Sequence, residues 1–196
     1  MATETLNPNA DGTTNQYSLS TGSSRFALVN DGDDDTYVYN SPNPIHAAHW
    51  WAIRIDGTTI YDADVEPGGS LDATLTNFTR EINSTNFSGC PTLTKDLITS
   101  LEIGMKAGVT SGTATQLLNL DNPTFPDSAT INSVTIHGRL SWESSSADTR
   151  IHEISLVVDY TAEASGYGND VIGIDSGDIS TVSGFATADI SEVIGM

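Results

Sequence analysis

Positive charge is scarce in this chain of 196 residues. Seven lysines and arginines oppose 26 aspartates and glutamates, which gives a formal net charge of −19 at pH 7. A surface of this sign repels the phosphates of nucleic acids and anionic lipid headgroups, so we expect binding to neither nucleic acid nor membrane. Solubility is the simplest explanation of the charge, and a saline habitat or a basic partner would also fit it.

Cysteine and long apolar runs are scarce as well. Cys90 is the only cysteine, which excludes a disulfide within one chain and a zinc site built from several cysteines. We predict that it is a small residue of the core or of a turn. No apolar run approaches the length of a membrane-spanning helix. Residues 1–22 lack the apolar segment of a signal peptide, so we expect synthesis in a cytoplasm without secretion by that route.

The sequence also lacks the common catalytic signatures. It contains no G-x-S-x-G, no P-loop and no dinucleotide-binding fingerprint. His46 and His49 form an H-x-x-H pair, but neighbouring prolines exclude the helix that such a zinc motif needs. His137 and His152 fall in predicted strands, at outward or interface positions with no nucleophile motif nearby. We therefore predict a protein that is not an enzyme and that holds no cofactor and no metal.

An acidic cluster at residues 31–35 (DGDDD) resembles part of a calcium-binding loop. Thr36 replaces the glycine that an EF-hand loop requires, and Pro42 stands where its bidentate glutamate would be. We predict a turn capped by aspartate side chains instead. A calcium site of another kind, between loops, is an open alternative in so acidic a chain.

What the sequence does contain is a series of short segments in which apolar and polar residues alternate, the pattern of half-buried strands. Asp56-Gly57 is a favourable hairpin dipeptide between two of them. Residues 97–107 predict a brief helical turn followed by a strand, whereas residues 7–12 and 108–129 read as loops. Strands are expected at 17–19, 25–30, 36–40, 48–56, 58–61, 71–82, 101–107, 130–142 and 150–160.

Eight or nine short strands with almost no helical periodicity predict an all-β fold, an antiparallel β-sandwich or jelly roll, over residues 1–162. The expected core consists of apolar residues on the inward faces of these strands. They are Phe26, Leu28, Val38, Trp51, Ile53, Ile103, Ile136, Leu140, Leu156 and Val158.

A short repetitive extension follows a predicted linker at residues 163–170. The motif Val-x-Gly-apolar occurs at residues 171–174, 182–185 and 193–196, at a spacing of eleven residues. One unit cannot bury its own apolar side chains, so the extension needs its own domain or another subunit to lie on, and we favour another subunit. The predicted docking residues are Val171, Ile172, Ile174, Ile179, Val182, Phe185, Ile190, Val193, Ile194 and Met196.

Aromatic residues form a further group of interest. Tyr17, Tyr37, Tyr39, Trp50 and Tyr61 fall at positions that we expect to be exposed. Exposed rings can stack on sugars, so a glycan is a possible partner. Core packing and subunit contact are the alternative roles for the same residues.

Several segments carry a family resemblance: residues 6–12, 25–30 and 33–38 near the N-terminus, residues 97–107, and residues 154–161. They resemble virion-associated β-sandwich proteins of tailed bacteriophages, especially aquatic phages. The Asp-Ile-Ser-x-Val-x-Gly units resemble short repeats of phage structural proteins. The resemblance implies a structural virion protein, either a tail or fibre component or a capsid decoration protein, located in the virion. It implies packing against other virion proteins as a homo-oligomer, a trimer or larger.

Two other functions are weighed against this one. A carbohydrate-binding β-sandwich module would use the exposed aromatic residues. A jelly-roll hydrolase would need two carboxylates facing each other across a cleft, and no pair among the 26 acidic residues is singled out by the sequence. The hydrolase is therefore the least favoured of the three.

Overall fold

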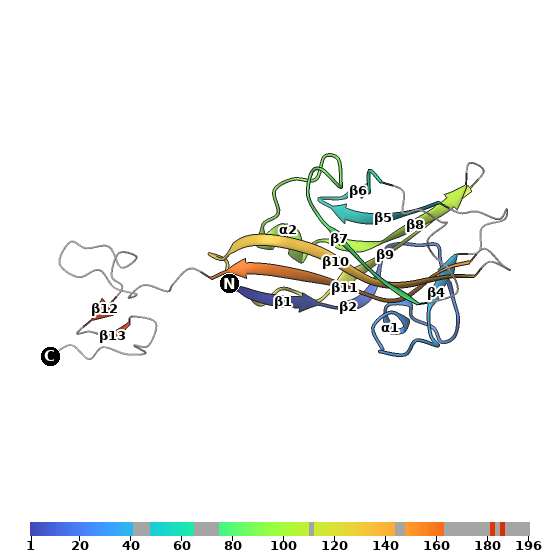
Figure 1. The fold of residues 1–196 in the computed structure, drawn as a ribbon, viewed down its shortest axis with the longest axis horizontal. Coiled ribbons are helices and arrows are strands. Elements are labelled where there is room, and N and C mark those ends of the chain that lie inside the picture. Colours follow the sequence, from blue (N-terminus) through green and yellow to red (C-terminus); the bar gives the residue numbers. More distant parts are fainter. Residues whose placement is uncertain are drawn as a thin grey trace.

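Two antiparallel β-sheets pack face to face in the computed structural model, which describes residues 1–40, 48–64, 75–109, 112–143, 148–162, 181–182 and 185–186 (Figure 1). The prediction of an all-β sandwich is confirmed. No helix in the described part of the chain is long and apolar enough to cross a membrane.

Six strands form the first sheet, sheet A. Five of them follow the order β3-β4-β11-β10-β7, and the sixth, β1, also pairs with β11. Ala2–Leu6 of β1 and the three residues of β4 pair with different parts of the same edge of β11. The strands are β1 (Ala2–Leu6), β3 (Ser18–Leu19), β4 (Val38–Asn40), β7 (Thr76–Glu81), β10 (Thr130–Glu143) and β11 (Asp148–Thr161).

Five strands form the second sheet, sheet B, in the order β2-β9-β8-β5-β6. The turn between β5 and β6 is the predicted Asp56-Gly57 hairpin, in which both residues have positive φ angles, 48° and 74°. This geometry belongs to the two-residue turns that match the twist of the strands. The strands are β2 (Pro8–Asn15), β5 (Ala48–Ile55), β6 (Thr58–Tyr61), β8 (Glu102–Val109) and β9 (Gly112–Leu120).

The prediction of a loop at residues 7–12 is wrong. The chain leaves sheet A after Leu6 and enters sheet B at Pro8, where it continues as β2. This strand lies at the edge of sheet B, which tolerates a proline at its first position, and its pairing with β9 shifts register between Asp11 and Asn15. Edge position and bulging explain how a sequence rich in turn-forming residues still forms a strand.

The strand predicted at residues 25–30 is also wrong, because Arg25–Leu28 forms the short helix α1. Asp11 of β2 stabilises its first turn: its Oδ1 accepts hydrogen bonds from the backbone N–H groups of Arg25 and Phe26, at 3.0 and 3.1 Å. Its Oδ2 lies 3.1 Å from the guanidinium of Arg25. A carboxylate distant in the sequence therefore provides the contacts that an N-terminal helix cap usually provides locally.

The helical turn predicted before the strand at 101–107 is confirmed as α2 (Lys95–Thr99), which is followed by β8. The loop predicted at 108–129 is wrong over Gly112–Leu120, which forms β9. Leu117 and Leu118 are adjacent and both fully buried, so they show no alternation. The backbone of Leu117 lies close against β2, where a Cβ added to Gly12 would lie 2.6 Å from the Leu117 carbonyl oxygen.

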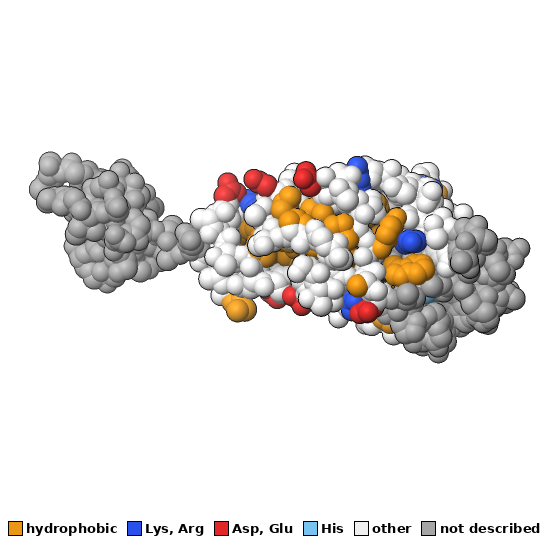
Figure 2. Space-filling view, turned by 90° about the horizontal axis from the view of Figure 1, so that it is seen from above, with side chains coloured by type: hydrophobic (Ala, Val, Ile, Leu, Met, Phe, Trp, Pro, Cys, Tyr) orange, Lys and Arg blue, Asp and Glu red, His pale blue; other side chains and the backbone are white. Residues whose placement is uncertain are grey.

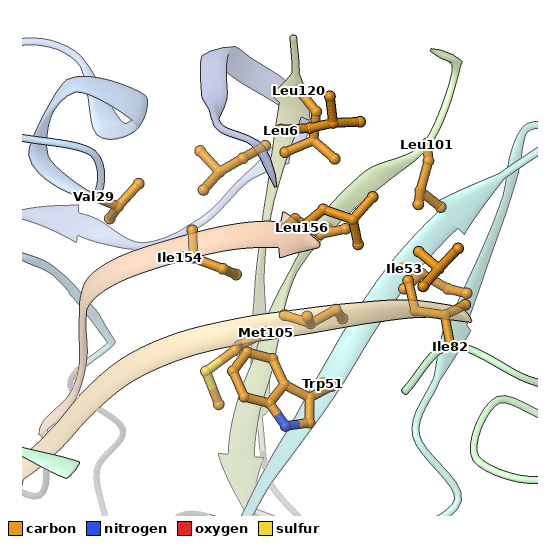
Figure 3. Packing of buried hydrophobic residues seen from close by; sticks show 14 of the residues in the cluster. Leu6, Val29, Trp51, Ile53, Ile82, Leu101, Met105, Leu120, Ile154 and Leu156 are labelled. Atoms are coloured by element: carbon orange, nitrogen blue, oxygen red, sulfur yellow. The ribbon is translucent and has the colours of Figure 1, made fainter. Parts of the chain in front are cut away.

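The core lies between the two sheets. Every predicted core residue is buried except Phe26, which is partly buried and packs against the cluster. Figure 3 shows Trp51 of β5 and Met105 of β8 side by side, with Ile154 and Leu156 of β11 among the residues around them. Burial of each such side chain contributes roughly 1.5–3 kcal/mol of transfer free energy.

A separate two-stranded sheet is formed by β12 (Thr181–Val182) and β13 (Phe185–Ala186) (Figure 1). The last strand of the sandwich ends at Thr161. The predicted linker at 163–170 and most of the extension lie outside the described residues, so those domain boundaries stay predictions.

Gly104 is expected to be intolerant of any side chain, because a Cβ at this position would overlap the backbone carbonyl of Gln116 on β9. We expect Gly104→Ala to lower the free energy of unfolding by about 1–3 kcal/mol, the usual cost of overpacking. Urea denaturation followed by tryptophan fluorescence measures this change. Thr113→Ala, at an exposed position of β9, is the control, and equal losses in both variants would contradict the prediction.

Candidate functional site

The first candidate residue, His49, lies between the two sheets. It is fully buried on the inward face of β5, and its Nδ1 is 2.7 Å from the hydroxyl of Thr149 on β11. Burial lowers the pKa of His49 to about 4, so the ring is neutral near pH 7. The predicted role as a strand histidine beside a core tryptophan is confirmed, whereas His46 lies outside the described residues.

His152 was expected at an outward or interface position. It lies on the outer face of sheet A, where it is only 4 % exposed. The backbone carbonyl of Asp34 accepts a hydrogen bond from Nδ1 at 2.8 Å, and Nε2 lies 2.7 Å from the hydroxyl of Ser141. Burial is the main cause that lowers the pKa of His152. His137, in contrast, is exposed as expected.

Residues 31–36, which we call the acidic turn, cover His152. Asp31 and Asp33 accept hydrogen bonds from the backbone N–H groups two residues ahead, each at 2.9 Å, which confirms the predicted aspartate-capped turn. Arg139 of β10 pairs with Asp34 at 2.7 Å, so the turn is bound to the face of sheet A. Among the described residues no group of three or more potential metal ligands occurs.

Ser141 and His152 have the relative geometry of a nucleophile and its general base. With Nδ1 donating to a carbonyl, Nε2 of the neutral ring accepts the hydroxyl proton. Both residues are only 4 % exposed, however, so a substrate cannot reach the hydroxyl in this arrangement. The pair serves here as a buried polar network that holds the acidic turn on sheet A.

A groove of roughly 340 Å³ lies on sheet A beside this turn, lined by residues of β7, β10 and β11 and by Asn7. His137 and Arg139 contribute from β10, and Glu153 contributes from β11. Burial is the main cause that raises the pKa of Glu153, whose Oε1 accepts a hydrogen bond from the backbone N–H of Gly32 at 2.7 Å. Two of the groove's three charged or titratable side chains thus already hold the acidic turn.

Cys90 lies beside a second hollow of roughly 270 Å³, at the loop that follows β7. It is 7 % exposed, and its backbone N–H donates to the carbonyl of Phe87 at 2.9 Å, so the predicted role in core or turn is confirmed. Burial raises the pKa of its thiol, which makes the sulfur less reactive.

The aromatic residues divide into two groups. Tyr17 was expected to be exposed, but it is buried at 1 %, because it packs into the core cluster. Tyr37 and Tyr39 are half-buried and contact each other edge to face, with ring centroids 5.9 Å apart. Trp50 and Tyr61 lie on the outer face of sheet B, half-buried and 38 % exposed respectively.

A lysine lies between these last two rings. Lys106 of β8 is the register partner of Trp50, and its Nζ is 4.7 Å from the centroid of Trp50 and 4.4 Å from that of Tyr61. Figure 2 looks onto the domain from above and shows Lys or Arg side chains next to hydrophobic groups on that face. Lys106 has no signal in the sequence that marks it as a site residue, since only the strand register brings it to the two aromatic residues.

The predicted docking residues of the extension are described in part. Val182 and Phe185 are register partners in the β12–β13 pair, at the centre of the three repeats. The other predicted docking residues lie outside the described part of the chain. They are Val171, Ile172, Ile174, Ile179, Ile190, Val193, Ile194 and Met196.

Comparison with known proteins gives no relatives: no family model, no curated protein and no solved structure matches the chain.

Stability should depend on pH through His49. In the unfolded chain its pKa is near 6.5, and in the folded protein about 4, so acid protonates the unfolded state first. The folded state therefore loses about 3 kcal/mol from this residue as the pH falls from 7 to 4. We expect His49→Gln to show a correspondingly smaller loss of unfolding free energy, measured by urea titration at both pH values.

The matched control is His137→Gln, which replaces an exposed histidine on the outer face of sheet A. Its acid destabilisation should equal that of the unmodified chain. Identical pH dependence in the His49 and His137 variants would contradict the assignment.

Proposed function

We propose that this chain is a structural subunit that assembles through its C-terminal repeats. The observation that carries the proposal is the β12–β13 pair, which places Val182 opposite Phe185 in the middle of three repeats with the same Val-x-Gly-apolar pattern. A repeated unit of this kind offers the same two apolar anchors at regular intervals.

Such a unit needs a partner surface. A pair of two-residue strands is too small to be stable in water by itself, and its apolar side chains gain free energy only when another surface buries them. Identical repeats in identical chains can supply that surface reciprocally, which favours a symmetric homo-oligomer.

The sandwich supports a role in assembly more than a role in catalysis. Ser141 and His152, which have the relative geometry of a nucleophile and its base, are closed off from solvent. Two of the three charged or titratable residues of the groove on sheet A, Arg139 and Glu153, hold the acidic turn. The polar residues thus serve to fix loops on a scaffold.

The specific assembly that we propose is the virion of a tailed bacteriophage, with the chain as a tail or fibre component or a capsid decoration protein. The sequence resemblance to phage β-sandwich proteins supports this assignment. The net charge of −19 favours a place where the subunit does not touch the packaged genome. A genomic neighbourhood of head and tail genes would support the assignment, and one of metabolic genes would contradict it.

We expect the full chain to form a trimer or larger oligomer, and the double variant Val182→Ser, Phe185→Ser to dissociate toward monomer. Replacing both anchors removes apolar surface at the centre of the repeats while leaving the sandwich unchanged. Light scattering coupled to size-exclusion chromatography measures the mass. Thr181→Ser, in the same strand pair, is the matched control and should keep the oligomer.

A monomeric full chain, or a double variant whose mass equals that of the oligomer, would refute assembly through the repeats. Circular dichroism of each variant confirms that the sandwich stays folded.

A further inference from the structure

The outer face of sheet B carries a small site formed by Trp50, Lys106 and Tyr61, which we call the aromatic–lysine site. Trp50 and Lys106 are register partners on β5 and β8, and Tyr61 lies on the edge strand β6. The side chains of the intervening residues Trp51 and Met105 are fully buried in the core. The site therefore lies on the surface, on strands whose inward faces are packed in the core.

The row of residues beside Trp50 and Lys106 is flat. Tyr61 pairs with Ala52, and Ala52 pairs with Gly104 on β8. With only a methyl group and a hydrogen at these two positions, no side chain separates Lys106 from Tyr61. The ammonium group consequently lies within 5 Å of both ring centroids, at 4.7 and 4.4 Å.

Lys106 differs from most other cations of the chain in its partners. None of the ion pairs within the described residues involves it, although the chain has 26 acidic residues. Its positive charge is matched only by the electron-rich faces of two rings, which do not neutralise it. Ion pairs of other cations within the described residues include Arg25–Asp11, Arg54–Glu102, Arg80–Asp62, Arg80–Asp64, Lys95–Asp127 and Arg139–Asp34.

We propose that the aromatic–lysine site binds a carboxylated sugar, as found in uronic-acid polysaccharides. The ammonium group of Lys106 pairs with the sugar carboxylate, and the rings of Trp50 and Tyr61 pack against the C–H faces of the pyranose. A fixed cation between two aromatic faces matches a ligand that is rigid, partly apolar and anionic. This binding is independent of the proposed assembly through the repeats.

An acidic peptide is a less suitable ligand for the same residues. It would bring carboxylates but no rigid apolar ring to cover Trp50 and Tyr61, and it would lose more conformational entropy on binding. Sugar rings in a polymer are already rigid, so they lose less conformational entropy when they pack against the aromatic residues.

The net charge of −19 gives the interaction a distinctive salt dependence. The whole protein repels an anionic polymer over long distances, and salt screens this repulsion first, because the Debye length falls from about 30 Å at 0.01 M to about 8 Å at 0.15 M. The contact between Lys106 and a carboxylate is short and weakens only at higher salt. Affinity should therefore rise between 0.01 and 0.15 M salt and fall again near 1 M.

The test is calorimetric titration of the full chain with oligogalacturonate, a chain of galacturonic acid units, and with its methyl ester. The ester keeps the sugar rings and removes the charge. We expect binding of oligogalacturonate to be at least tenfold tighter than that of the ester. Lys106→Gln should lose about tenfold in affinity for oligogalacturonate, and Tyr61→Leu, which keeps an apolar but not an aromatic side chain, should lose severalfold.

The matched control is Lys95→Gln, which changes the net charge by the same amount at a lysine paired with Asp127. It should bind oligogalacturonate as the unmodified chain does, and near-ultraviolet circular dichroism should show all variants folded. No binding by the unmodified chain, or equal binding by the Lys106 and Lys95 variants, would overturn the proposal. A change of oligomeric mass in Lys106→Gln would also overturn it, since the site would then be a contact between copies.

Discussion

The pairing of β10 with β11 supports all of sheet A. Both strands are 14 residues long, and each of the other strands of the sheet attaches directly or indirectly to this pair. The pairing shifts register between Arg139 and Leu140, which leaves His152 as the extra residue on β11. This bulge turns His152 toward the acidic turn, residues 31–36. An irregularity in the β10–β11 pairing therefore positions the turn that covers His152 on the outer face of sheet A.

The two sheets are joined at several levels along the sandwich. Trp51 fills the space between them from β5, and the small residue Gly138 on β10 makes room for its ring. The hydrogen bond between His49 and Thr149 links the same two sheets through polar atoms. The N-terminal chain adds a covalent connection, because β1 belongs to sheet A and the following β2 to sheet B. Apolar packing thus supplies the free energy of association, while the polar pair restricts how the sheets align.

Sequence patterns predicted the strands whose two faces differ in environment. In β5, Trp51, Ile53 and Ile55 are buried as their alternation indicated. The pattern failed where a distant segment changed the environment: Gly12 of β2 closely approaches the backbone of Leu117 on β9, and Asp11 caps α1. Neither contact has a local signature. The same reason explains Lys106, whose neighbours on β5 and β6 follow only from the strand register.

Charge places a constraint on any assembly of this chain. Copies that each carry a net charge of −19 repel one another, so contacts between their sandwich surfaces are disfavoured unless cations offset the acids. Most of the cations are already used within the chain; Arg80, for example, pairs with Asp62 and Asp64. The predicted docking residues of the extension are, by contrast, all apolar. Association through such residues would depend on apolar burial, and the association would strengthen as salt screens the repulsion between copies. The extension is therefore better suited than the sandwich to hold subunits together.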